Sequence, residues 1–244
     1  MFQDLTKRIP ALEEMDKEDI APEALEGALA SLMRINVIGN GAGIFWPEIR
    51  ALLEARVPSK GPMRVLDIGC GAGDLAQKLE TRARKRGYDL AVDGCDFSPV
   101  AVAMAQRLYG TTERPNRFFV LDAITDPIPD DYDIIMNSLF FHHLDNEAGK
   151  LVLEKMAEST REAVLMSDLI RSRFGLGLVY LATRTLSRSP IVHADGVTSL
   201  LAAYSMEEVS DLTKSLDLTG ATVTRRWPER FLLRWRKQGP TIDV

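Results

Sequence analysis

The chain has 244 residues, which is enough for one large domain with additions or for two small domains. Its 45% hydrophobic and 27% charged residues are typical of a globular protein with a buried core. The formal net charge of -5 gives no general attraction to DNA or RNA, whose phosphates are usually met by basic surfaces. We therefore expect no nucleic-acid partner.

Cysteine usage and the length of the apolar runs bear on localisation. Cys70 and Cys95 are not spaced as metal ligands, so reduced thiols in a cytoplasmic protein are the simplest interpretation. The acidic N-terminal stretch lacks the apolar core of a signal peptide, and no run approaches the roughly 18 apolar residues of a membrane helix. We expect a cytoplasmic protein with no membrane partner.

The first part of the chain has a helical pattern. Between residues 20 and 56, apolar residues recur at three- and four-residue intervals, and the stretch NVIGNGAG interrupts them. The glycines of this stretch follow no strand, so we interpret it either as a segment that folds over a cofactor or as an ordinary helix-breaking turn. With PSKGP as a linker, the sequence predicts an N-terminal helical cap over residues 1–58.

From residue 64 onwards, apolar strands alternate with helices. This order predicts an α/β fold with a doubly wound, mostly parallel sheet that is covered on both faces. The last two strands have a short connection, which indicates an antiparallel pair at one sheet edge. Seven strands are expected, at residues 64–69, 90–96, 116–123, 132–140, 162–169, 220–228 and 230–237.

Residues 171–204 form a long connection between the fifth strand and the last helix, where a few residues would normally suffice. Open α/β sheets bind their ligands at the carboxyl ends of the strands. We therefore expect a helical lid here, inserted into a main domain of residues 59–244; a merely structural excursion is the alternative. Arg171 and Arg173 at its start either bind an acidic substrate group or are solvated or helix-capping residues.

The stretch RVLDIGCGAGD places a tight glycine turn after the first strand. A dinucleotide fingerprint has its third glycine three residues after the second, but this chain has Asp74 there. An acid at the start of a helix stands where a pyrophosphate needs free backbone amides. Phosphate binding is therefore disfavoured, and a ligand with a cationic or neutral group fits better.

The stretch VLDIGCGAGDLA resembles the first motif of class I S-adenosylmethionine-dependent methyltransferases. The resemblance implies a Rossmann-like methyltransferase fold, S-adenosylmethionine as cofactor and S-adenosylhomocysteine as product. In that family the glycines let the backbone approach the cofactor, and the strand-end acid helps arrange the loop and the cofactor's amino group. On this chain the acid is Asp67 and the glycines are Gly69, Gly71 and Gly73.

Acids also end the second and third expected strands. A carboxylate at Asp96 can accept hydrogen bonds from both ribose hydroxyls, as in NAD enzymes. The resemblance implies that Phe97 packs on adenine and that Asp122 takes the adenine amino group. Taken singly, each acid could equally cap a helix or a turn. The cofactor-binding candidates are Asp67, Gly69, Cys70, Gly71, Gly73, Asp96, Phe97, Ser98, Asp122, Ala123, Asn137 and Ser138.

Two histidines follow the fourth expected strand. Its NSLF lacks the paired prolines of enzymes that methylate exocyclic base amines, and carboxylates for a divalent metal are poorly supplied, so we expect no metal. An imidazole with a pKa of about 6.5 can remove a phenol proton at neutral pH. Either His142 or His143 is a candidate catalytic base, with His143 preferred; alternatively, one of them only shapes the loop.

A narrower resemblance is to bacterial methyltransferases found beside polyketide synthases, through LMRINVIGNGAG, ADGVTSLLAAYSMEEV and VTRRWPERFLLRW. It implies O-methylation of a phenolic, polyketide-like or quinone-like small molecule, so an aromatic acceptor is expected, and a homodimer is compatible with it. Two alternatives stay open: an NAD-dependent oxidoreductase, and a non-catalytic regulatory protein that binds S-adenosylmethionine.

Overall fold

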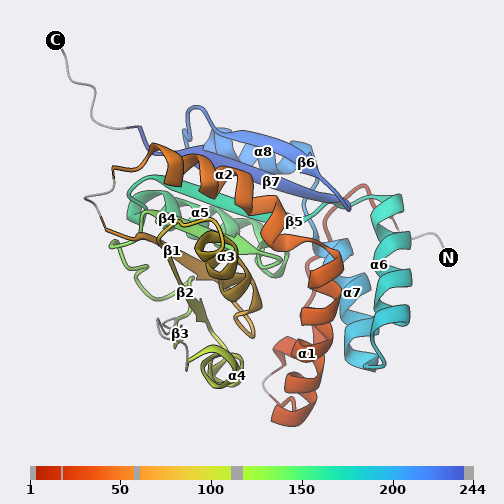
Figure 1. Cartoon of the computed structure of the whole chain (residues 1–244). Coiled ribbons are helices and arrows are strands. Elements are labelled where there is room, and N and C mark those ends of the chain that lie inside the picture. The colour runs from red at the N-terminus through yellow and green to blue at the C-terminus, as the bar shows by residue number, and fades with distance from the viewer. Residues whose placement is uncertain (1–3, 18, 58–60, 111–117, 239–244) are drawn as a thin grey trace.

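The computed structural model describes residues 4–17, 19–57, 61–110 and 118–238. Its strands form one sheet in the order β3-β2-β1-β4-β5-β7-β6, in which the first five strands are parallel and β7 is antiparallel to both of its neighbours (Figure 1). The predicted doubly wound sheet with an antiparallel edge is confirmed. The strands are β1 (Met63–Ile68), β2 (Leu90–Asp96), β3 (Phe118–Val120), β4 (Ile134–Ser138), β5 (Ala163–Leu169), β6 (Thr222–Arg226) and β7 (Arg230–Arg236).

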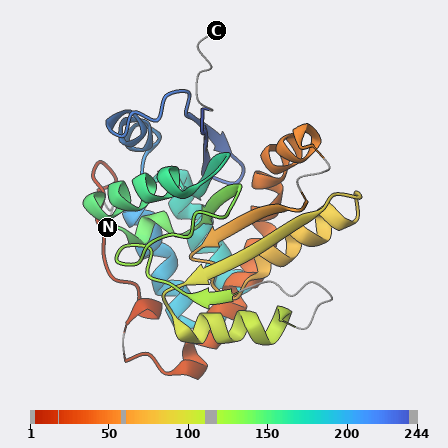
Figure 2. The same ribbon diagram turned by 90° about the vertical axis from the view of Figure 1, so that its left-hand side faces the viewer.

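Helices cover both faces of this sheet because the buried strands are apolar on both sides. In β1, Val65 packs in the core cluster on one face, and its neighbour Leu66 packs in the cluster on the other. Figure 2 shows the sheet between its helical layers from the left-hand side of Figure 1. The first face carries α2 (Gly41–Ala55), α3 (Asp74–Arg84) and α4 (Pro99–Tyr109); the second carries α5 (Asn146–Ser159) and α8 (Met206–Ser215).

Helix α2, in the second half of the expected N-terminal cap, packs against the sheet. Phe45 and Ile49 of α2 are fully buried in the same core cluster as residues of the sheet, so α2 is part of one helical layer on the sheet. The change of packing occurs at Asn40, which has a left-handed backbone (φ +50) between α1 (Pro22–Ile38) and α2. NVIGNGAG is thus a break between helices; residues 58–60 of the expected linker and residues 116–117 of the third expected strand lie outside the described residues.

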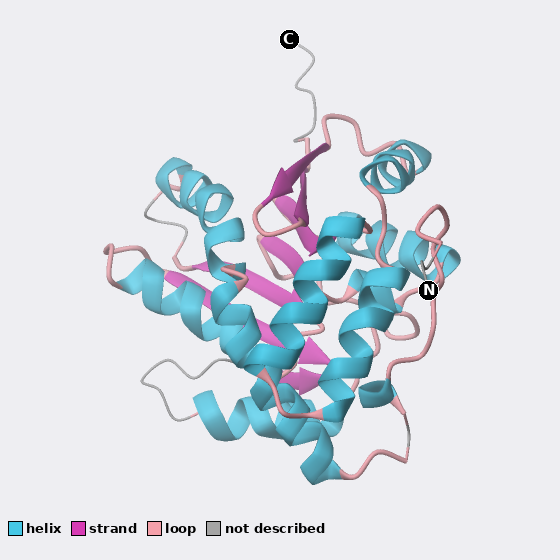
Figure 3. Cartoon of the chain, turned by 90° about the vertical axis from the view of Figure 1, so that its right-hand side faces the viewer, coloured by secondary structure: helices cyan, strands magenta, loops and turns pink. Residues whose placement is uncertain are grey.

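The expected lid consists of two helices, α6 (Arg173–Leu186) and α7 (Pro190–Ala202). Together with α1 they lie beside the sheet on the right of Figure 1, and Figure 3 shows them in front of the strands. Arg171, at the start of this insertion, is buried in an ion pair with Glu208 at 2.8 Å, so its role here is structural.

No single described helix is long and apolar enough to span a membrane. The pair Pro22–Asn36 and Gly41–Ala55, bent by 64°, reaches the required length and composition only when the two helices are taken together.

Candidate active site

The glycine turn after β1 adopts a backbone that only glycine accommodates well. Gly69, Gly71 and Gly73 have φ values of +69, +52 and +77. A Cβ on Gly69 would lie 2.6 Å from a ring carbon of Phe140, so the turn packs directly against the chain that follows β4. Because β1 and β4 are neighbours from which the sheet winds in opposite directions, this is the switch point where such sheets bind ligands.

Asp67 ends β1 as a buried carboxylate in need of a partner. Its side chain is 1% exposed, and its Oδ1 atom has no hydrogen-bond partner. Burial, together with the nearby charges of Asp74 and Asp96, raises the pKa of Asp67 well above its ordinary value. A cationic ligand group such as an ammonium would satisfy the orphaned oxygen and relieve the repulsion. The site therefore fits a positively charged ligand group here.

Asp96, at the end of β2, fixes the glycine turn from the side. Its Oδ2 accepts a hydrogen bond from the Gly71 amide at 2.9 Å, and its Oδ1 accepts one from the Ser98 amide at 3.0 Å. Each carboxylate oxygen retains acceptor capacity for a further hydroxyl. Burial raises the pKa of Asp96, although the two backbone hydrogen bonds oppose this shift. Ser98 itself caps α4 by accepting from the Ala101 amide.

Asp122 also closes a local turn, as the simpler interpretation of the sequence allowed. Its Oδ1 accepts from the Ile124 amide at 2.9 Å, and its Oδ2 accepts from the Thr125 hydroxyl at 3.0 Å. Even so, Asp122 lines a hollow of about 360 Å³, which we call the first hollow. The other predicted residues in this hollow are Gly69, Asp96, Phe97, Ser98, Ala123 and His143.

A second hollow, of about 200 Å³, opens on the other side of the glycine turn. Its floor includes Asp67 and Cys70, and α6 and α7 close it with Val179 and Val192. Gly69 and His143 are among the residues that line both hollows. Among the predicted residues, Asp67, Gly69, Cys70, Ser138, His142 and His143 line the second hollow.

His143 stands at the border of the two hollows with one ring nitrogen held. Its Nδ1 lies 2.7 Å from Oδ2 of Asp16, a residue of the N-terminal segment. In the part of the chain that the structure describes, no hydrogen-bond partner is found for its Nε2. A histidine oriented by a carboxylate on one nitrogen and open on the other has the arrangement of a general base.

His142 is placed differently, although it is the adjacent residue. Its Nδ1 lies 2.7 Å from Oδ1 of Asp168 and its Nε2 lies 3.4 Å from Oε1 of Glu13, and all three side chains are buried. Burial alone would lower the pKa of His142, but the two carboxylates raise it to about 10. This shift favours the imidazolium form of His142, and both of its ring nitrogens face carboxylates, so His143 is the better placed of the two to act as a base.

Ligand atoms of Glu13, His142 and His143 lie within 4.8 Å of one another, which is the donor set of a transition-metal site. In the geometry described, however, a proton on His142 Nε2 already faces Glu13. Without a metal ion, His142 forms an ion pair with Glu13 and Asp168.

Three predicted cofactor residues, Gly71, Gly73 and Asn137, line neither hollow. Asn137 in β4 is fully buried, and its Nδ2 donates to the sulfur of Met156 at 3.4 Å. The next residue, Ser138, reaches the second hollow but also accepts a hydrogen bond from Arg230 at 2.8 Å.

The N-terminal segment supplies site residues that the sequence interpretation missed. Besides Glu13 and Asp16, it places Arg8 over the ring of Tyr204 at 3.7 Å and against the carbonyl of Leu144 at 2.6 Å. Asp195 of α7 accepts from two backbone amides of this segment. The sequence shows a high density of acidic residues in LEEMDKED. Their spacing does not indicate which of them face the site.

Comparison with known proteins identifies the domain that carries this geometry. Residues 65–163 match the family described as "Methyltransferase domain", and they include the glycine turn, Asp96, Asp122 and both histidines. Residues 65–163 thus correspond to a class I S-adenosylmethionine-dependent methyltransferase domain. S-adenosylmethionine binding is typical of this class, and the orphaned carboxylate of Asp67 fits the cofactor's ammonium group.

The similar proteins differ in what their names say they act on. Demethylmenaquinone methyltransferase of Thermus thermophilus is 39% identical over 71 residues, 29% of this chain and 30% of that protein. The chain thus spans about a third of the length of this curated relative. The CurJ carbon methyltransferase superposes with a TM-score of 0.65 at 13% identity, covering 92% of this chain and 63% of that one. Magnesium protoporphyrin IX methyltransferase of Synechocystis PCC 6803 was solved with bound S-adenosylhomocysteine. It superposes with a TM-score of 0.55 at 14% identity, covering 92% of this chain and 91% of that one. Both structures support the fold alone.

Proposed function

We propose that this protein methylates a small-molecule hydroxyl group, using S-adenosylmethionine as methyl donor and His143 as general base. The observation that carries the proposal is the position of His143. Held by Asp16 at 2.7 Å, it stands where the first hollow meets the second. A base at that border can reach an acceptor in the second hollow while the donor extends from the first hollow along the glycine turn to Asp67, on the floor of the second.

The residues present fit the cofactor at both of its ends. Asp67 would bind the ammonium group, and Asp96 would accept hydrogen bonds from the ribose hydroxyls. Phe97, 54% exposed at the edge of the first hollow, would cover the adenine, whose amino group would donate to Asp122. When bound, S-adenosylmethionine supplies an electrophilic methyl group on a sulfonium centre.

The chain itself contributes a proton acceptor and the alignment of the reacting groups. His143 Nε2 takes the proton of the acceptor hydroxyl as the oxygen attacks, and Asp16 stabilises the imidazolium that forms. The lid helices hold the acceptor in the second hollow and exclude water from it. Most of the remaining rate enhancement comes from this alignment of acceptor and methyl group.

We infer a phenolic, polyketide-like or quinone-like acceptor. This inference is supported by the apolar wall of the second hollow, which is formed by Leu32, Met33, Val179 and Val192. The resemblance to methyltransferases found beside polyketide synthases also supports it. The relative from Thermus thermophilus, named for demethylmenaquinone, is consistent with this class.

The function is tested by incubating the protein with methyl-labelled S-adenosylmethionine and a broad panel of phenols and hydroquinones. Mass spectrometry is expected to show label on an acceptor oxygen, together with S-adenosylhomocysteine. Cofactor binding without transfer to any member of the panel would instead support a regulatory protein.

Cofactor binding is tested separately by calorimetric titration with S-adenosylhomocysteine and with NAD. We expect S-adenosylhomocysteine to bind in preference to NAD, because Asp74 occupies the helix start that the pyrophosphate of NAD would need. Asp96→Ala is expected to weaken this binding by about 1–3 kcal/mol, since it strands hydrogen-bond partners. Asp130→Ala, which removes an exposed carboxylate, serves as control. Tight binding of NAD alone would refute the cofactor assignment.

A further inference from the structure

Helix α6 exposes large apolar side chains to solvent. Phe174, Tyr180 and Leu181 are 57%, 52% and 60% exposed, whereas Gly175 and Thr183 on the same helix are buried. Soluble proteins seldom gather such side chains on one exposed surface unless it binds something. In Figures 1 and 3, α6 lies on the outside of the lid.

The charged side chains of α6 and of the residues that flank it in sequence are of one sign. Residues 169–194 contain four arginines and no aspartate, glutamate or lysine, in a chain whose net charge is -5. Arg171 is buried in its ion pair, but Arg173, Arg184 and Arg188 are exposed. The guanidinium of Arg184 lies 3.6 Å from the centre of the Tyr180 ring, so cationic and apolar groups form one surface.

The turn between β6 and β7 extends this surface at the start of α6. Glu229 of the turn accepts a hydrogen bond from the Ser172 hydroxyl at 2.6 Å, and its carbonyl accepts one from the Ile170 amide at 3.0 Å. Trp227, two residues earlier, is 72% exposed. An indole beside an amphipathic helix is a typical element of a membrane interface.

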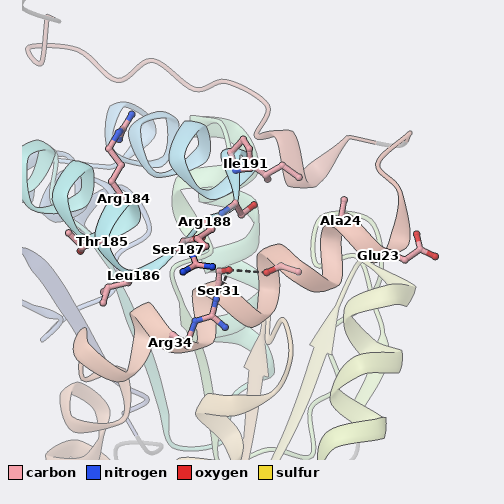
Figure 4. A pocket seen from close by; sticks show the side chains of 13 residues that line it. Glu23, Ala24, Ser31, Arg34, Arg184, Thr185, Leu186, Ser187, Arg188 and Ile191 are labelled. Carbon is pink, nitrogen blue, oxygen red and sulfur yellow. Dashed lines mark hydrogen bonds between the residues drawn. The ribbon is translucent and has the colours of Figure 1, made fainter.

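At the other end of α6, a hollow of about 720 Å³ lies between α1 and the α6–α7 connection (Figure 4). Arg34, Arg184 and Arg188 line it, and Glu23 is a carboxylate at its edge. Arg34 donates to the Ser31 hydroxyl at 2.9 Å. Among the described residues, none of the three guanidinium groups forms an ion pair with a carboxylate. The hollow can therefore accept a phosphate oxygen from outside the chain.

We propose that α6, Trp227 and this arginine-lined hollow form a docking surface for a bilayer containing anionic phospholipids. The apolar and aromatic side chains would enter the boundary between headgroups and acyl chains, and the arginines would bind lipid phosphates. Such a helix lies on a membrane without spanning it. The prediction of no membrane partner considered only spanning and signal segments. Docking on a membrane surface requires neither.

The charges favour a lipid surface over a second copy of this chain. In a two-fold dimer the same patch lies on both partners. Two copies of α6 packed on each other would bring Arg173, Arg184 and Arg188 of one chain close to those of the other without intervening acids on the helix. A bilayer with anionic headgroups supplies the opposite charge.

The same helix connects this surface to the candidate active site, because Val179 and Thr183 of α6 line the second hollow. We infer that α6 admits an apolar acceptor from the bilayer; this step rests on the proposed function, whereas docking on lipid does not.

Docking is tested by sedimentation of the full chain with phosphatidylcholine vesicles that contain or lack phosphatidylglycerol, without cofactor or acceptor. We expect binding that requires phosphatidylglycerol and weakens as salt is raised. Phe174→Ser/Leu181→Ser and Arg184→Gln/Arg188→Gln are each expected to lower the partition coefficient at least tenfold. Lys150→Gln/Leu151→Ser, which removes one exposed cation and one exposed leucine from α5, is the matched control.

Circular dichroism confirms that each variant is folded, and light scattering gives its oligomeric state. Failure of the wild-type chain to bind phosphatidylglycerol vesicles would overturn the proposal, as would binding that both α6 variants retain. A wild-type dimer that the α6 variants convert to monomers would assign the surface to a second copy instead. Because the assay contains no substrate, its outcome is independent of whether methyl transfer occurs.

Discussion

His143→Ala is expected to lower kcat by about 10²–10⁴-fold, the usual contribution of a positioned general base. The affinity for S-adenosylhomocysteine, measured by calorimetry, should stay near that of the wild type, because His143 only borders the first hollow. Asp16→Asn should lower kcat by a smaller factor, since it keeps the hydrogen bond to Nδ1 but loses the charge that stabilises the imidazolium.

His193→Ala provides a matched control for this prediction. His193 lies in α7, its Nε2 is 2.9 Å from the Ser187 carbonyl, and it lines neither the first nor the second hollow. Unchanged turnover in His143→Ala, with an acceptor that the wild-type chain methylates, would remove the general-base assignment.

His142→Gln is expected to destabilise the fold by about 3–5 kcal/mol, because it removes one partner from a buried ion pair. Asp168 and Glu13 would then be buried without their shared cation. The free energy of unfolding, obtained by urea titration, measures this loss. His193→Gln, at a half-buried site, should change it little, and an equal loss in both variants would argue against a special role for the ion pair.

The pH dependence of stability provides a second test of the same ion pair. The His142 pKa is about 10 in the folded chain, above its ordinary value of 6.5. The stabilisation is therefore fully present below pH 6.5 and is lost as the pH rises through 10. Burial would raise the Asp168 pKa, but His142 lowers it from 3.8 to about 2. This contribution is present above pH 3.8 and is lost as the pH falls through 2.

We therefore expect the free energy of unfolding of the wild-type chain to fall between pH 6.5 and 10, and the fall to be smaller in His142→Gln. Parallel curves for the two proteins would show that His142 is not held as a cation in the folded state.

Residues at strand ends were predictable from the sequence because the chemistry and the strand lie in one short stretch. Asp67, Gly69 and Asp96 each lie at the carboxyl end of a predicted strand, and the parallel order of the strands brings their ends to one edge of the sheet. The structure places all three at the candidate site.

The partners of the histidines could not be predicted in this way. Asp16 and His143 are 127 residues apart, and the N-terminal segment has no regular period that would place it on a surface of the domain. His142 and His143 are adjacent and identical in type, so only burial and their carboxylate partners assign one to a structural ion pair and the other to the border of the hollows. Helical periodicity likewise predicted α2 but not the surface against which it packs.

The proposal that His143 deprotonates an acceptor beside the methyl donor is tested most directly by a crystal structure with S-adenosylhomocysteine and a phenolic acceptor bound. We predict that the ammonium group lies on Asp67, that the ribose lies on Asp96, and that the acceptor oxygen lies between the cofactor sulfur and His143 Nε2. An acceptor oxygen facing away from His143, or a cofactor that contacts neither Asp67 nor Asp96, would contradict it.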